Sequence, residues 1–174
     1  MVDRIWAGWR IRSIQADRAR EPAPADDGAT LFDRIRTSSR PDDETYVIER
    51  RPHAFVVLNR YPYSVGHLLV VPNRAVEHLE DLTADESHAL WDTVRDAVVA
   101  VKLAFGPDGV NVGLNLGEGA GPSVPDHVHV HVVPRWKADT NFMTAVADVR
   151  VMPQTLGESW EALTAVWTGS TGGH

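Results

Sequence analysis

The chain has 174 residues, 43% of them apolar, and this length predicts one globular domain that buries roughly 70% of its unfolded surface. It contains no cysteine, which excludes a disulfide framework, a thiol nucleophile and a cysteine-bound zinc ribbon. Its 17 Lys+Arg and 24 Asp+Glu give a formal net charge of −7, which argues against a nucleic-acid partner because such binding needs a basic surface.

Residues 1–45, the first in chain order, are expected to form an N-terminal arm and loops. Residues 1–20 interleave five Arg with apolar residues, which is not the pattern of a secretory signal. Residues 20–30 and 37–45 are rich in helix and strand breakers and read as surface loops. No wholly apolar run in the chain exceeds five residues, whereas a bilayer span needs roughly 20. We therefore expect a cytoplasmic protein without a membrane partner.

Short strands and one long helix are predicted next. Three strand-like runs are β-branched or aromatic and are bounded by Pro, Asn or Gly: 46–49, 55–58 and 67–71. Residues 83–105 are predicted to be a helix, since Thr83 and Glu86 have capping-box spacing. Its apolar residues recur at helical intervals and form one stripe for packing on a sheet: Leu90, Val94, Val98, Val101 and Phe105.

A strand over 110–116, a glycine-rich turn and a strand over 128–133 follow. Strands joined by short loops, with one long helix, indicate an α+β domain built on a mainly antiparallel sheet of about five strands. A short C-terminal helix is also expected. The predicted division is an arm and loops over 1–45, a central domain over 46–150, and a C-terminal extension with a disordered tail over 151–174.

The most informative segment is DHVHVHVVPRW, residues 126–136. If it is a strand, alternation places His127, His129 and His131 on one face, with successive Cα atoms about 6.5 to 7 Å apart. The valines between them then point into the core. Three histidines in register, directly after a glycine-rich loop, are poorly explained as structural residues, and we interpret them as a functional site.

Several chemistries fit such a row of imidazoles. Neutral imidazoles can share a zinc ion, which would give a metal-dependent hydrolase. One imidazole can instead attack phosphorus while a neighbour protonates the leaving oxygen. The loop 117–123 favours phosphate chemistry, because its backbone amides and the Ser123 hydroxyl suit phosphate oxygens. A Ser123–His127–Asp126 hydrolase is a further alternative, but it lacks a G-x-S-x-G elbow and leaves two histidines unused.

The same segment resembles the signature of the histidine triad (HIT) family. NRYPYSVGHLLVVP (59–72) resembles the first conserved block of the family, and NVGLNLGEGAGPS (111–123) resembles the block that leads into the triad. The resemblance covers about 46–143, and the flanks at 4–10 and 133–143 are similar to bacterial members that hydrolyse or phosphorolyse diadenosine tetraphosphate. It implies a HIT-type fold and a nucleotidyl hydrolase or transferase acting on dinucleoside polyphosphates.

The resemblance also implies a role for each histidine. The middle histidine of the family is the nucleophile, so His129 is expected to attack the α-phosphorus and to form a covalent nucleotidyl-imidazole, which water or phosphate then cleaves. His131 would hydrogen-bond the phosphate and leaving-group oxygens, and His127 would orient its neighbour. Five further residues would support the triad or bind the nucleotide: Asn59, His67, Asn115, Gly121 and Ser123.

Two departures from the family pattern matter. Pro122 has no amide hydrogen to give a phosphate, so one loop donor is lost and hydrolysis and phosphorolysis both stay open. Residues 31–35 stand where many relatives carry a cysteine pair for a structural zinc, and no such site is expected. Asn59 also has an ordinary reading, as a turn residue before Tyr61, and Ser123 another, as a loop hydroxyl facing water.

Cofactors and partners follow from the same resemblance. The covalent step requires no cofactor, and Mg²⁺ is expected only with the polyphosphate substrate. Related proteins are homodimers in which the sheets of two subunits join, so a homodimer is expected here. Two alternatives to a triad enzyme remain: a nucleotide-binding module with slow or vestigial chemistry, and a metal-dependent hydrolase that uses the same histidines.

Overall fold

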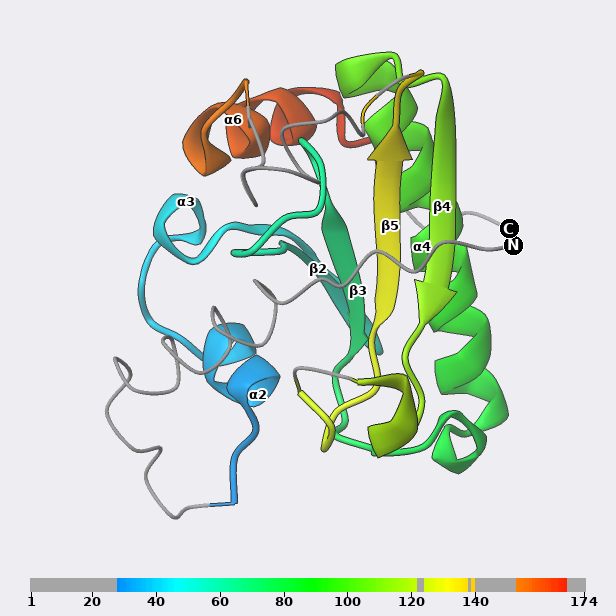
Figure 1. The fold of residues 1–174 in the computed structure, drawn as a ribbon. Coiled ribbons are helices and arrows are strands. Elements are labelled where there is room, and N and C mark those ends of the chain that lie inside the picture. Colours follow the sequence, from blue (N-terminus) through cyan, green and yellow to red (C-terminus); the bar gives the residue numbers. More distant parts are fainter. Residues whose placement is uncertain (1–27, 122–123, 138, 140–152, 169–174) are drawn as a thin grey trace, which may run out of the picture. The chain divides into compact units, whose positions relative to one another are not determined.

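The computed structural model describes residues 28–121, 124–137, 139 and 153–168 (Figure 1). The predictions for residues 1–27, for Pro122 and Ser123 and for the tail over 169–174 lie outside these residues. The chain divides into two units, and the one that carries the sheet comprises Thr30–Lys137 and Met152–His174. The other unit, Met1–Ala29 with Ala138–Val151, falls almost wholly outside the described residues. The three-part division made from the sequence stays a prediction.

Five strands form one sheet in the order β1-β2-β3-β5-β4. All four pairings are antiparallel, which confirms the predicted α+β class with about five strands. The strands are β1 (Val47–Arg50), β2 (Ala54–Leu58), β3 (Leu68–Pro72), β4 (Gly109–Leu114) and β5 (Val130–Arg135). β1 and β4 are the edges, and β3 and β5 lie in the middle, where the histidines are.

The helices within the described residues are α2 (Leu31–Arg36), α3 (Asp42–Thr45), the long α4 (Ala84–Phe105) and α6 (Leu156–Val166), with 3-10 turns η1 (Leu79–Asp81) and η2 (Glu118–Ala120). The predicted long helix and short C-terminal helix are confirmed. α2 and α3 lie where the sequence predicted only an arm and loops. None of the described helices has the length and apolar character that crossing a bilayer requires.

Capping boxes begin α2, α4 and α6. Each N-cap threonine accepts a hydrogen bond from the amide three residues later, and the acidic side chain at that position accepts one from the threonine amide. The pairs are Thr30 with Asp33, Thr83 with Glu86, and Thr155 with Glu158. Such caps satisfy amides that the first helical turn leaves unpaired.

The two faces of the sheet have different partners. One face, with Val56, Val70 and Val130 at its centre, packs against α4 and α6 and forms the main core. The other face carries a smaller cluster in which Phe32 of α2 packs on Phe55 and its neighbours. Alternation along the strands decides which side chains belong to each face.

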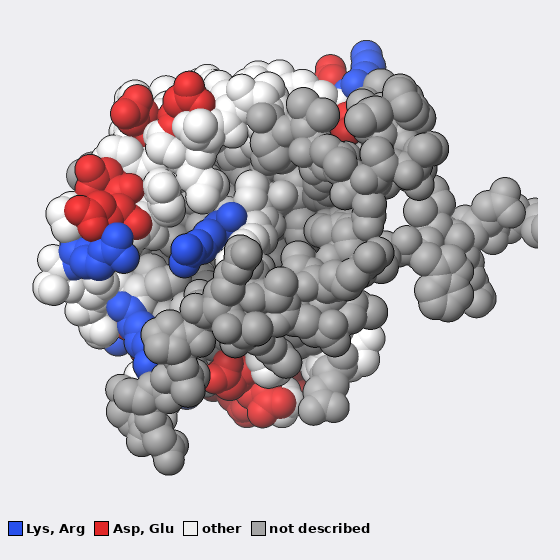
Figure 2. All heavy atoms as spheres, turned by 60° about the vertical axis from the view of Figure 1, so that its left-hand side comes forward, with Lys and Arg blue, Asp and Glu red and all other residues white. Residues whose placement is uncertain are grey.

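Charges of both signs lie on the face that carries α2 and α3. Figure 2 shows blue and red side chains next to one another among the described residues there. Arg40 pairs with Glu44 at 3.0 Å and Arg50 pairs with Asp42 at 2.6 Å. Paired charges of this kind do not make the basic surface that a nucleic-acid partner needs.

Candidate active site

The histidine row is not built as the sequence predicted. β5 begins at Val130, so only His131 of the three histidines lies in a strand. The ladder between β3 and β5 ends at the pair Val70–Val130, and two residues further along β3 is Pro72, which has no amide hydrogen to continue it. The approach to β5 is held instead by the amide of Val128, which donates to the carbonyl of Val76 at 2.7 Å.

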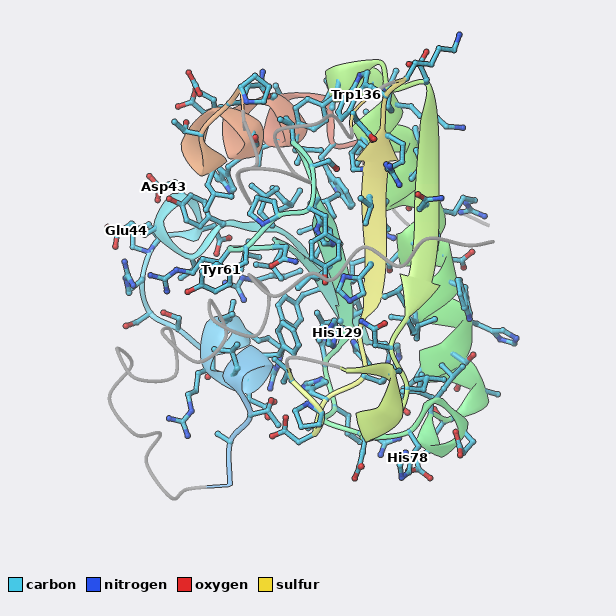
Figure 3. The ribbon with its side chains drawn as sticks, in the orientation of Figure 1. Asp43, Glu44, Tyr61, His78, His129 and Trp136 are labelled. Atoms are coloured by element: carbon cyan, nitrogen blue, oxygen red, sulfur yellow. The ribbon has the colours of Figure 1, made fainter. Side chains whose placement is uncertain are left out.

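His129 is nearly buried and presents one free nitrogen. Its side chain is 4% exposed, and Figure 3 shows it at the start of β5 on the side of the sheet where α2 lies. Nδ1 lies 2.9 Å from the carbonyl oxygen of His127, which can only accept, so Nδ1 carries the ring proton. Nε2 then has the lone pair, and it has no hydrogen-bond partner among the described residues. Burial lowers the pKa of His129, which keeps this lone pair available.

His131 is linked to His67 by a chain of directed hydrogen bonds. The amide of Tyr63 donates to Nδ1 of His67 at 3.1 Å, so the proton of the His67 ring is on Nε2. That Nε2 lies 3.0 Å from Nδ1 of His131 and donates to it. A neutral His131 therefore carries its own proton on Nε2, where it can be given to an oxygen. The rings of His129 and His131 lie 5.0 Å apart between centroids.

The other predicted binding residues lie around this chain. Asn59 donates from Nδ2 to Nδ1 of His67 at 3.3 Å, and its Oδ1 accepts from the amide of Tyr61 at 3.0 Å. It therefore serves the turn as well as the site. The side-chain amide of Asn115 lies 3.4 Å from Nε2 of His131 through Nδ2, and a half-turn of this amide brings its oxygen to the same place, where it can accept the Nε2 proton. Gly121, with φ of 68°, lies in the exposed loop that follows η2.

His127 is fully buried and both of its ring nitrogens have oxygen partners. Nδ1 lies 2.8 Å from the hydroxyl of Thr30, and Nε2 lies 2.8 Å from the carbonyl oxygen of Pro72. With both nitrogens occupied, His127 is not placed to act as the general base of a serine hydrolase with Asp126, which is exposed. The serine-hydrolase alternative does not fit this arrangement.

The histidines also do not converge as metal ligands do. Metal ligation needs lone pairs that point at one position, whereas His127 has no nitrogen to spare and His129 has one. Within the described part of the chain, no group of three or more His, Cys, Asp or Glu is arranged to hold a metal ion. The geometry suits a nucleophile with a neighbouring proton donor.

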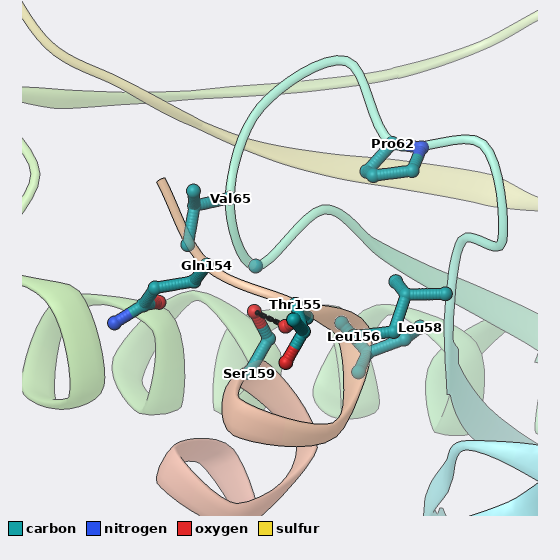
Figure 4. A pocket seen from close by; sticks show the side chains of 8 residues that line it. Leu58, Pro62, Val65, Gln154, Thr155, Leu156 and Ser159 are labelled. Atoms are coloured by element: carbon teal, nitrogen blue, oxygen red, sulfur yellow. Dashed lines mark hydrogen bonds between the residues drawn. The ribbon is translucent and has the colours of Figure 1, made fainter. Parts of the chain in front are cut away.

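A separate cavity of about 220 Å³ lies between the loop before β3 and the start of α6 (Figure 4). Its lining is mostly apolar and contains none of the histidines. The residues that line it are Leu58, Pro62, Val65, Gly66, Gln154, Thr155, Leu156 and Ser159. It is not the candidate active site.

Sequence reasoning missed three residues that contact the histidines, Thr30, Phe32 and Tyr63, and a fourth, Asp33, that contacts one of these. Thr30 contacts His127, and the ring of Phe32 lies 5.0 Å from that of His129 and 5.5 Å from that of His127. Asp33 contacts Thr30, and Tyr63 stacks on His131 with ring centroids 5.9 Å apart. The spacing of Thr30 and Asp33 is a capping-box pattern, so the start of α2 could have been found. No sequence signal placed this helix against the triad.

Comparison with known proteins points to one family. A model of the HIT domain matches residues 40–138. The AP-4-A phosphorylase of Mycobacterium tuberculosis is 41% identical over 167 residues, which cover 95% of this chain and 85% of that protein. The asymmetrical bis(5'-nucleosyl)-tetraphosphatase of Schizosaccharomyces pombe is 45% identical over 86 residues, 49% of this chain and 46% of that protein.

Solved structures agree with the fold. A Zn-bound histidine triad family protein from Mycobacterium smegmatis superimposes with a TM-score of 0.62 at 25% identity, covering 79% of this chain and 91% of that chain. A Hit-like protein from Bartonella henselae superimposes with a TM-score of 0.62 at 22% identity, covering 81% of this chain and 98% of that chain.

Proposed function

The chain belongs to the HIT domain family, and from this premise we propose that it cleaves dinucleoside polyphosphates through a covalent nucleotidyl-histidine intermediate. One observation carries the proposal. The proton of His129 is held on Nδ1 by the carbonyl of His127, so Nε2 presents a lone pair beside the ring of His131. A nucleophile next to a proton donor is the arrangement that phosphoryl-group transfer through histidine requires.

In the first step, Nε2 of His129 attacks the α-phosphorus of the substrate. A nitrogen–phosphorus bond forms and the bond from phosphorus to the bridging oxygen breaks. That oxygen leaves with the electron pair and accepts a hydrogen bond from Nε2 of His131. The chain from the Tyr63 amide through His67 supports this role, because it places the His131 proton on Nε2. His127 contributes its carbonyl oxygen, which holds the nucleophilic ring in place.

In the second step, an oxygen of the acceptor attacks the same phosphorus and the bond to His129 breaks. Asn115 and Gly121, with Ser123, are proposed to hold the phosphate oxygens on which charge accumulates. Asn115 is supported by its position 3.4 Å from His131, and Gly121 by its place in the loop between η2 and β5. Asn59 and His67 are proposed to support the site from the loop before β3.

We propose diadenosine tetraphosphate as substrate and inorganic phosphate as acceptor. The relative that supports this choice, the AP-4-A phosphorylase, matches 95% of this chain, whereas the tetraphosphatase matches 49%. Attack on the α-phosphorus then releases ATP and leaves AMP on His129, and phosphate converts that AMP to ADP. Mg²⁺ accompanies the polyphosphate, and the covalent step needs no cofactor.

We also propose that two copies of the chain form a homodimer through the β4 edge. Within the described residues β4 pairs with a strand on one side only, and Val112 on it is 41% exposed. Three large apolar side chains of α4 are exposed as well: Trp91, Val99 and Leu103. An unpaired edge strand beside exposed apolar residues is the kind of surface that a second copy covers. A cytoplasmic location is proposed too, supported by a sequence without cysteine.

The test is product analysis of the purified protein with diadenosine tetraphosphate, with and without phosphate. ATP and ADP that appear only with phosphate would establish phosphorolysis. ATP and AMP without phosphate would establish hydrolysis and correct the proposed acceptor. If no nucleotide of a panel is turned over, the proposal of an enzyme fails and a nucleotide-binding module is the better description.

A further inference from the structure

The capping box of α2 is joined to the triad by a line of short contacts. The hydroxyl oxygen of Thr30 lies 2.8 Å from Oδ2 of Asp33 and 2.8 Å from Nδ1 of His127. It also accepts from the amide of Asp33 at 3.1 Å, as an N-cap does. On the far side of the ring, Nε2 of His127 lies 2.8 Å from the carbonyl oxygen of Pro72. Among the described residues, the α4 and α6 capping boxes make no hydrogen bond of this kind with a histidine.

The three short contacts along this line, Pro72–His127, His127–Thr30 and Thr30–Asp33, need one proton each. A neutral His127 ring and the Thr30 hydroxyl supply one proton each, and an ionised Asp33 supplies none. One more proton is therefore required. Two heteroatoms 2.8 Å apart without a hydrogen between them repel, so each of the two gaps beside the Thr30 oxygen holds a proton. Thr30 provides one. The carbonyl of Pro72 can only accept, so the neutral ring of His127 has its single proton on Nε2. The second gap must be filled by a proton on Nδ1 of His127 or on Asp33.

The carboxyl of Asp33 is the weaker candidate. Burial raises its pKa, but hydrogen bonds from the hydroxyl and the amide of Thr30, with the charges of His127 and Arg36, bring it below the ordinary value. Oδ2 of Asp33 also accepts from the amide of Thr30 at 3.1 Å, and hydrogen bonds donated to a carboxylate favour its ionised form. The second proton therefore belongs on Nδ1 of His127.

The groups that shift the pKa of His127 come from α2, from the end of β3 and from the loop of His127 itself. Burial lowers its pKa, and Arg36 of α2 acts in the same direction. The carbonyl of Pro72 and the charges of Asp33 and Asp126 raise it, but burial is the largest cause and the pKa of His127 lies below its ordinary value. The second proton is therefore required by the short contacts with Thr30 and Pro72. Of the two carboxylates, Asp33 is the one joined to the ring through a hydroxyl, so it is the group placed to offset the cost of burying a charge.

We propose that Asp33, acting through Thr30, is a positioning residue that holds His127 as an imidazolium beside the nucleophile. The catalytic consequence rests on the proposed function. A positive ring at His127 disfavours a second positive ring at His129, so His129 stays unprotonated and nucleophilic at mildly acidic pH. Burial lowers the pKa of His129 most, and the charge of His127 lowers it further.

Nitrogen NMR of the free, full-length protein with labelled histidine tests the proton directly. At about pH 6.5, where an ordinary histidine is half protonated, both ring nitrogens of His127 are expected to carry hydrogen. Thr30→Val and Asp33→Asn should remove the hydrogen from Nδ1, and Thr30→Ser, which keeps the hydroxyl, should retain it. A neutral His127 in the wild type, or an Asp33→Asn variant that keeps both hydrogens, would overturn the proposal.

Thr155→Val is the matched control, because it removes the same N-cap contacts from α6, whose capping box makes no hydrogen bond to a triad histidine among the described residues. It should lose stability as Thr30→Val does but leave the His127 signals unchanged. If Thr30→Val does not fold, the near-isosteric Asp33→Asn and the Thr30→Ser variant still decide the outcome.

The pH dependence of kcat/KM tests the consequence for His129. Without the charge on His127, a proton binds His129 more readily. In Asp33→Asn and Thr30→Val the fall of kcat/KM on the acid side should therefore begin at a pH about one unit higher than in the wild type. Thr30→Ser and Thr155→Val should match the wild type. An equal loss of rate at every pH would show a purely structural role and would overturn the catalytic part. If the protein turns over no nucleotide, the proposed function fails, whereas the NMR result still decides the proton.

Discussion

At the scale of single residues, the site depends on where each imidazole keeps its proton. Carbonyl oxygens hold the protons of His129 on Nδ1 and of His127 on Nε2, and a backbone amide directs that of His67 to Nε2. These assignments leave one lone pair, on His129, next to one donor, on His131. Backbone groups set this pattern, so it does not depend on the identity of most neighbouring side chains.

Replacing His129 by alanine should abolish turnover while nucleotide binding persists. The variant removes the nucleophile but leaves the loop and the other histidines that are proposed to bind phosphate. Steady-state rates and nucleotide titration by calorimetry measure the two effects separately. His88→Ala, at an exposed position of α4, is the control and should behave as the wild type. Near-normal turnover by His129→Ala would contradict the covalent mechanism.

At the scale of elements, the loop before β3 fixes His67 through a close contact with the end of α4. Gly66 has φ of 70°, and a Cβ atom built on it would lie 2.2 Å from the ring of Phe105. Only glycine avoids both the backbone strain and this clash.

Gly66→Ala should therefore lower the free energy of unfolding by about 2 to 4 kcal/mol, from left-handed strain and overpacking together. It should also reduce turnover, because His67 is the next residue. Denaturant unfolding measures the first effect. Gly109→Ala, where an added Cβ meets nothing within 4 Å, should cost far less. Equal stability of the two variants would refute the close contact.

Local pattern was enough to predict some elements and not others. The helix over 83–105 was found because its capping box and its apolar stripe agree, and both are present in α4. The predicted start of β5 was wrong because the alternation in the sequence includes His127 and His129, whereas the strand begins only at Val130. The ladder ends there because of Pro72 on β3, which lies 55 positions before His127 in the chain. α2 has six residues and no periodic pattern, and the burial of Phe32 against the sheet is tertiary packing.

Some residues of the site could likewise be predicted from local sequence motifs, and others could not because they depend on tertiary contacts. The triad and its supporting residues could be named from ordered motifs, because those residues lie in the segments that resemble the family. Thr30 and Asp33 could not, because their contact with His127 joins positions 97 residues apart. Which ring nitrogen carries a proton also depends on partners from other elements, such as Pro72.

At the scale of the whole molecule, we predict that a charge at the β4 edge separates the proposed dimer. Val112→Asp places a carboxylate on a strand edge that a second copy would cover, at a cost large enough to favour monomers. Light scattering after size exclusion should report a dimer for the wild type and a monomer for the variant. Ala75→Asp, in an exposed loop, should remain dimeric. A monomeric wild type would contradict the proposed assembly.

The most direct test of the central claim is mass spectrometry of the protein quenched within the first turnover of diadenosine tetraphosphate. The account predicts one adenylate attached through nitrogen to the peptide that contains His129, formed before phosphate is added and lost when it is. Turnover that proceeds without any such adduct, or with the adenylate on another residue, would contradict it.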